Sequence, residues 1–136
     1  MNARTRVQLT YVALAVATIV IGLLVHLRGT AFSPDVRDVL GDALWAAMMF
    51  WWVSAAVPDA SRRKRGLTAL AICFAVEVSQ LFHTPLLDAL RGTWFGRLVL
   101  GSGFDSRDLL AYASGVLAAL AIERASRSAF PHSFPS

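Results

Sequence analysis

The sequence predicts an all-α polytopic membrane protein, with four transmembrane helices and a short interfacial or re-entrant helix between the third and the fourth. Of the 136 residues, 56% are hydrophobic, 16% are charged, and the mean hydropathy is +0.54. A soluble domain carries about 25% charged residues. The charges are also segregated, which leaves apolar runs long enough to cross a bilayer. We therefore expect residues 1–136 to form a single transmembrane domain.

The first two spans are predicted at residues 7–27 and about 40–57. As a helix, the first run is long enough to cross a hydrocarbon core of about 30 Å. It is also longer than the apolar part of a signal peptide, so we expect a retained anchor. Before the second span, Ser33 and Pro34 form a helix start, with Ser33 as the cap and Pro34 at the first helical position.

The remaining segments are predicted from polar and proline-rich breaks in the chain. The break at residues 58–66 contains four consecutive basic residues, and the third span follows over about 67–83. The interfacial segment is expected at 85–100, where large apolar residues have an amphipathic spacing. The fourth span is expected at 108–122. The polar tail, residues 125–136, is expected to be frayed.

The basic residues predict the orientation. With both termini in the cytoplasm, eight of the 13 Lys and Arg residues lie on the cytoplasmic side, four of them in the basic block of residues 62–65. We expect a multi-pass protein of the bacterial inner (cytoplasmic) membrane. The aspartates have the opposite distribution. Those at or near the outer face are Asp35, Asp38, Asp42, Asp88, Asp105 and Asp108.

Several partners and chemistries are not indicated. The net charge of +4 comes largely from the basic block, which has no stacking aromatics or recognition helix beside it, so no nucleic acid is expected. We interpret the block as a topology signal, with contact to anionic lipid as a secondary effect. Cys73 lies alone in an apolar run without metal-ligand spacing. No metal or cofactor is expected, and an enzymatic activity is left open.

A carboxylate inside the third span points to a functional site. At this depth an acidic side chain costs roughly 2.5–3.5 kcal/mol, so a partner is expected. Glu77 is therefore either protonated or paired with an arginine of the following connector. The candidate arginines are Arg91, Arg97 and Arg107.

Polar residues around Glu77 recur at helical spacing. Gln80 follows Glu77 by three residues, and Tyr112 follows Asp108 by four, so each pair lies on one helix face. We expect the two faces to meet as one cluster between the third and fourth spans. A structural network that only locks the helices together is the alternative. The candidate ligand-binding residues are Asp42, Glu77, Gln80, Arg91, Arg97, Asp105, Asp108 and Tyr112.

Three segments of the chain form a recognisable pattern: Gly41-Asp42-Ala43-Leu44-Trp45, Glu77-Val78-Ser79-Gln80-Leu81 and residues 100–115. This pattern resembles the VanZ-like superfamily, and in particular its small bacterial branch of uncharacterised four-helix membrane proteins. The resemblance covers roughly residues 39–119 and departs from the larger branch in having no Lys–His pair around Asp42. The named member is linked to glycopeptide (teicoplanin) resistance, so the resemblance implies a role in the cell envelope.

Three classes of function remain open. The first is binding or handling of an envelope molecule such as a lipid-linked cell-wall precursor, in which arginines suit phosphate and carboxylates suit hydroxyls or amines. The second is a structural or assembly subunit without a ligand of its own. The third is an ion-coupled carrier or an enzyme that uses Glu77 and Asp108. The lipid bilayer is the expected surrounding in every case, and the oligomeric state is not predicted.

Overall fold

The chain folds into six α-helices and one short 3-10 helix over the residues that the structure, a computed structural model, describes: 1–101 and 103–129. Three of the helices are long and apolar enough to cross a membrane. They are α1, α2 and, over Ser106–Arg127, α6. The elements are α1 (Ala3–Arg28), η1 (Gly29–Ala31), α2 (Pro34–Ala56), α3 (Arg62–Ser79), α4 (Pro85–Gly92), α5 (Trp94–Leu100) and α6 (Ser106–Ala129).

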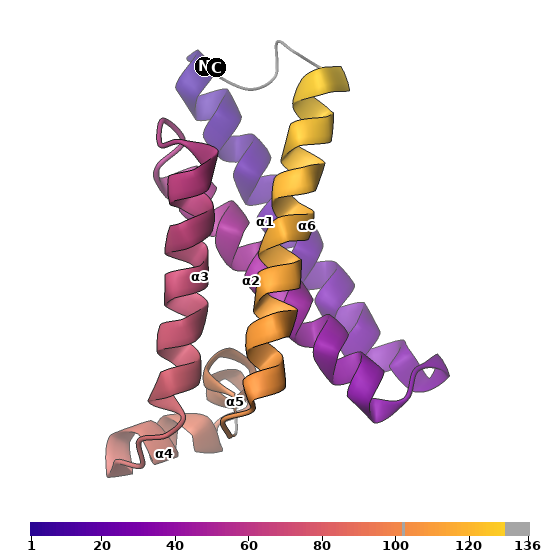
Figure 1. The fold of residues 1–136 in the computed structure, drawn as a ribbon, viewed down its shortest axis with the longest axis vertical. Coiled ribbons are helices and arrows are strands. Elements are labelled where there is room, and N and C mark those ends of the chain that lie inside the picture. Colours follow the sequence, from indigo (N-terminus) through magenta and orange to yellow (C-terminus); the bar gives the residue numbers. More distant parts are fainter. Residues whose placement is uncertain (102, 130–136) are drawn as a thin grey trace.

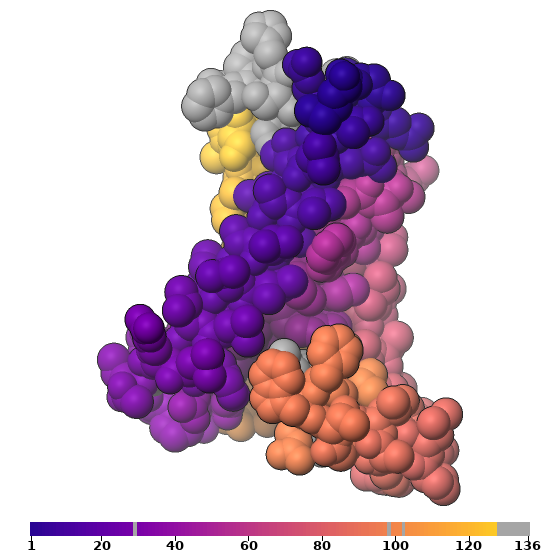
Figure 2. Space-filling view, turned by 180° about the vertical axis from the view of Figure 1, so that it is seen from behind, coloured from indigo at the N-terminus to yellow at the C-terminus, as the bar shows by residue number. Residues whose placement is uncertain are grey.

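The helices converge at one end of the molecule and diverge at the other (Figure 1). α1 and α2 form a long antiparallel hairpin, and α6 packs against both α2 and α3. The beginnings of α1 and α3 and the end of α6 lie at the convergent end. At the divergent end the α1–α2 hairpin separates from α3 and α6, and α4 and α5 lie there. Seen from behind, α5 lies over this opening (Figure 2).

The predicted count of four spans is not confirmed, because α3 is not among the three candidate membrane-spanning helices. Five of its 18 residues are charged. The basic block was expected in a turn, but it forms the first turn of α3, since the Lys64 amide donates a hydrogen bond to the Ser61 hydroxyl at 3.3 Å. The helix then ends at Ser79, so the predicted span of 67–83 is displaced toward the N-terminus.

Two predicted helix signals have different outcomes. The Ser33–Pro34 start is confirmed, because the Val36 amide donates to the Ser33 hydroxyl and Pro34 occupies the first turn of α2. The single interfacial segment of 85–100 is instead two short helices. They are separated at Thr93. Its backbone amide donates a hydrogen bond to the carbonyl of Leu90, and its hydroxyl accepts one from the Gly96 amide in the first turn of α5.

The predicted end of the fourth span is also wrong. α6 continues to Ala129 rather than ending at residue 122, so residues 125–129 of the expected frayed tail are helical. Its 24 residues span about 36 Å as an α-helix. Residues 130–136 lie outside the described part of the chain. The continuation has a physical cause, because Arg127 pairs with Glu123 one turn earlier at 2.8 Å.

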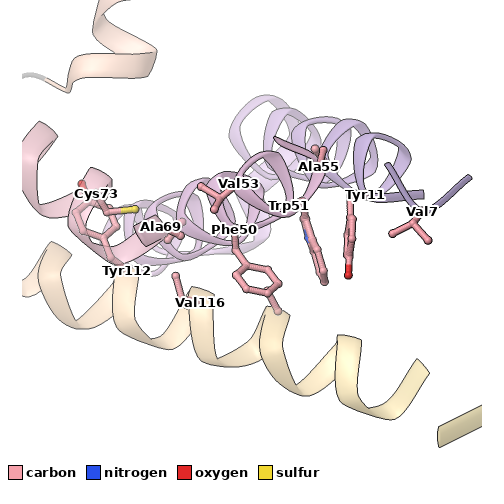
Figure 3. Packing of buried hydrophobic residues seen from close by; sticks show 13 residues of the cluster. Val7, Tyr11, Phe50, Trp51, Val53, Ala55, Ala69, Cys73, Tyr112 and Val116 are labelled. Carbon is pink, nitrogen blue, oxygen red and sulfur yellow. The ribbon is translucent and has the colours of Figure 1, made fainter. Parts of the chain in front are cut away.

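The core is a column of small and aromatic side chains along the facing sides of the helices (Figure 3). The rings of Tyr11 and Trp51 stack with centroids 6.2 Å apart, and both point toward α6. The ring of Trp51 also contacts the ring of Phe50 edge-on, with centroids 5.0 Å apart. Cys73 is fully buried in the same cluster, as the sequence predicted. Many large apolar residues remain exposed on the outside, as expected of surfaces that face lipid.

α2 and α6 touch through their backbones. Three small residues of α6 that are spaced four apart, Ala111, Gly115 and Ala119, are all buried. A Cβ atom at Gly115 would overlap the carbonyl oxygen of Ala43. The crossing therefore requires glycine, and it holds the neighbouring aspartates of the two helices close together.

We predict that Gly115→Ala lowers the melting temperature in detergent, corresponding to roughly 1–3 kcal/mol, because the added methyl group forces the two backbones apart. The matched control is Gly41→Ala, where a Cβ atom meets nothing within 4 Å. Alanine is there the better helix residue by about 1 kcal/mol, so this control is expected to keep or gain stability. Equal stability of the two variants would contradict the close crossing.

Candidate functional site

Glu77 is the centre of a closed hydrogen-bond network. Its side chain is fully buried, and one carboxylate oxygen accepts bonds from the Tyr112 hydroxyl at 2.9 Å and the Gln80 amide at 3.1 Å. The other oxygen accepts the backbone amide of Asp105 at 2.8 Å. The network therefore joins α3, the connector before α6, and α6 itself. It brings together four of the residues predicted from the sequence, with Asp105 taking part through its backbone amide.

Arginines do not bond Glu77 in the described residues, contrary to one of the two expectations for this carboxylate. Arg91 instead donates to the carbonyls of Ser79 and Phe82 at 2.7 and 2.9 Å, and so caps the end of α3. Arg107 donates to the Asp105 carboxylate at 3.0 Å. These hydrogen bonds from Arg107 hold the pKa of Asp105 below its ordinary value. Both arginines are thus engaged in local structure.

Gly101 brings the connector against Gln80. Its φ of +69° lies in the region that favours glycine, and a Cβ atom there would come within 2.5 Å of the Gln80 amide nitrogen. This close approach places the following residues so that the amide of Asp105 reaches Glu77.

A cavity of about 500 Å³ lies beside the Glu77 network, at the divergent end of the helices. Its walls come from α1, α2, the end of α3, α5, the connector before α6, and α6. Glu77 does not line it. The apolar part includes Ile19, Leu23, Leu44, Met48 and Val76. The polar and aromatic part includes His26, Asp35, Arg37, Asp38, Asp42, Trp45, Gln80, Arg97, Asp105, Arg107, Asp108 and Tyr112.

Two aspartates form a pair in the cavity wall. Asp42 from α2 and Asp108 from α6 both line the cavity, and their carboxyl groups lie close enough to interact electrostatically. Two neighbouring carboxylates repel each other, which favours a shared proton or a bound cation. The pair therefore offers a proton-sharing or cation-binding position. Asp108 interacts electrostatically with both Asp42 and Glu77. No hydrogen bond joins Asp108 to Glu77 in the described residues, so its membership of the predicted cluster with Glu77 stays a prediction.

Some polar groups at the cavity have no partner in residues 1–101 and 103–129. The Gln80 side chain is only 6% exposed, and its Oε1 has no hydrogen bond because its Nε2 is committed to Glu77. The Nε of Arg37 is likewise buried without a partner. Arg97 is exposed at the cavity wall and forms no ion pair with a described residue. An acceptor and two cations thus remain available to a ligand.

A second buried network, missed by the sequence analysis, lies at the convergent end. Arg65 is 1% exposed and donates to Glu123 at 2.8 Å and to the hydroxyl of Tyr11 at 3.0 Å. Tyr11 also donates to Glu123 at 2.8 Å. Arg65 was hidden within a block that looks solvated, and Glu123 within a tail that looks polar.

Spacing is the signal that identifies this second network. Arg65 precedes Glu77 by 12 residues, and Glu123 follows Tyr112 by 11. Antiparallel helices that pair Glu77 with Tyr112 therefore bring Arg65 opposite Glu123.

In the described residues, no three side chains of His, Cys, Asp or Glu are grouped to hold a metal ion.

The comparisons with known proteins yield one family match. A family model described as "Protein of unknown function (DUF2809)" matches residues 33–116. The matched region contains all eight candidate ligand-binding residues, whereas Tyr11 and Glu123 lie outside it. The match does not link the chain to the VanZ-like superfamily. No solved structure matches the chain.

We predict that Glu77→Gln lowers the free energy of unfolding by roughly 1–3 kcal/mol. An amide nitrogen cannot accept a hydrogen bond, so at least one of the three buried donors must turn or lose its acceptor. The measurement is the melting temperature in detergent.

The matched control is Asp105→Asn, also a change from carboxylate to amide. The bond from Asp105 to Glu77 uses the backbone amide, and asparagine caps a helix as well as aspartate does. This control is expected to melt close to the unchanged protein. If Glu77→Gln melts there too, Glu77 does not hold the network together.

Proposed function

The chain belongs to the DUF2809 family of proteins of unknown function, and we propose that its cavity binds the polar head group of a membrane amphiphile. A lipid-linked cell-wall precursor is the kind of molecule that fits this chemistry. The proposed place is the outer face of the bacterial inner membrane, with both termini in the cytoplasm. This orientation is supported by the bias of basic residues toward the convergent end.

The observation that carries the proposal is a cavity of mixed character with unpaired polar groups. Its volume of about 500 Å³ lies within the range of small-molecule sites. A buried acceptor without a partner, such as Gln80 Oε1, costs free energy unless a ligand or water bonds it. Apolar side chains line the same cavity, which suits a molecule with both a polar and a hydrocarbon part.

The charged groups suggest how the head group is held. Arg37 and Arg97 suit a phosphate, because a guanidinium donates several hydrogen bonds to its oxygens. The Asp42–Asp108 pair suits a hydroxyl or an amine. Gln80 Oε1 accepts a further donor of the same kind. Together these groups favour a phosphate linked to a sugar or an amine over a simple anion.

The proposal includes two finer points about the family and the topology. The resemblance to VanZ-like proteins supports an envelope role. We also propose that α3 is a fourth transmembrane span, since its two buried charged residues, Arg65 and Glu77, are bonded within the bundle.

The aspartate pair favours a second candidate function, that of an ion-coupled carrier or enzyme. In this alternative Asp42 and Asp108 exchange a proton or hold a cation, and Glu77, which does not line the cavity, takes no part. The closed hydrogen-bond network of Glu77 also suits a structural role for Glu77, which is the part of the chain that favours the structural-subunit alternative.

We predict that undecaprenyl phosphate raises the melting temperature of the purified protein in detergent. A ligand whose free concentration is 100 times its dissociation constant stabilises the folded protein by about 2.7 kcal/mol. Arg97→Gln is expected to weaken binding about tenfold, because it removes a charge-assisted hydrogen bond worth roughly 1.5–3 kcal/mol.

The matched control is Arg28→Gln, an exposed arginine that does not line the cavity. It is expected to bind the probe with unchanged affinity. Phosphatidylcholine is the control lipid and is expected to shift the melting temperature less. Equal shifts with both lipids, or equal loss in both arginine variants, would rule out the proposed head-group site.

A further inference from the structure

We propose that the groove between α3 and α6 is a second ligand site, which binds an anionic phospholipid. It is separate from the cavity described above, lies toward the convergent end, and has a volume of about 240 Å³. Its walls are apolar side chains of both helices, with one charged residue among those that line it. The lining includes Arg63, Gly66, Leu67, Leu70, Val116 and Leu117.

Gly66 lies at the base of the groove, where α3 packs closely on α6. It is buried, and a Cβ atom there would come within 3.3 Å of a Leu120 methyl group. Leu67 and Leu117 stand on either side and are 58% and 65% exposed. An apolar groove open on the outer surface of α3 and α6 suits a hydrocarbon chain.

Basic residues stand at the end of this groove. Arg62, Arg63 and Lys64 form the exposed first turn of α3, and none is in an ion pair with a described residue. The neighbouring acidic residue, Asp59, pairs with Arg4 at 3.2 Å. Basic side chains at a helix start are unfavourable, because the helix dipole is positive there. These three residues therefore cost α3 stability unless an anion lies nearby.

The position of Arg63 joins the two features. It belongs to the basic turn and also lines the apolar groove. Arg65, two residues later, turns inward to Glu123 and takes no part. A lipid phosphate beside Arg63 would place its acyl chain along the groove. Charge complementarity selects a lipid with a net negative charge, since basic pockets between membrane helices favour such head groups.

The test measures lipid retention by native mass spectrometry after purification in detergent with equal amounts of phosphatidylglycerol and phosphatidylcholine. The unchanged protein is expected to retain phosphatidylglycerol preferentially. The triple variant Arg62→Gln, Arg63→Gln, Lys64→Gln is expected to lose this preference about tenfold. The control is Arg6→Gln, which removes an exposed basic residue that does not line the groove and leaves the Arg4–Asp59 pair intact.

A second variant separates a defined site from general attraction to charge. Ala113→Phe fills the groove, which Ala113 lines, and leaves every charge in place. It is expected to lower phosphatidylglycerol retention at an unchanged melting temperature in phosphatidylcholine micelles. Glycerol 3-phosphate, a head group without a chain, is expected not to compete. Unchanged retention in Ala113→Phe, equal loss in the Arg6→Gln control, or competition by glycerol 3-phosphate would each overturn the proposal.

Discussion

The arrangement of α3 depends on buried polar bonds at both of its ends. Arg65 near its start is bonded to Glu123, and Glu77 near its end is bonded to Tyr112. Both partners lie on α6, and the spacings on the two antiparallel helices match. A charge buried in apolar surroundings is strongly unfavourable unless it is paired and hydrogen-bonded. These networks therefore specify the register of α3 against α6, because a shift of one turn would break both.

The same register shapes the candidate site. The Glu77 network draws the connector before α6 against the end of α3, where Gly101 contacts Gln80. It also commits the Gln80 amide nitrogen and leaves its oxygen for the cavity. On the other wall, the close crossing at Gly115 brings Asp42 and Asp108 together. The polar groups of the cavity are thus held by packed helices, which favours a preformed site.

Much of the fold follows from local sequence, and the rest depends on long-range contacts. The all-helical class, the Ser33–Pro34 start and the cluster of Glu77, Gln80 and Tyr112 could be predicted from composition, capping and helical spacing. The inward turn of Arg65 can be predicted only once Glu77 is paired with Tyr112, because the three basic neighbours of Arg65 are exposed and its partners lie 54 and 58 residues away. The pairing of Asp42 with Asp108 was missed for a similar reason. It depends on how closely α2 approaches α6 at Gly115.

The most direct test of the register of α3 is a double-mutant cycle on Arg65 and Glu123, read as the free energy of unfolding in mixed detergent micelles. Each single change, Arg65→Met or Glu123→Met, leaves one buried charge without its partner and is expected to cost about 3–5 kcal/mol. The double change removes both charges and is expected to recover much of that loss. Additive effects of the two changes, or single variants as stable as the unchanged protein, would contradict the account.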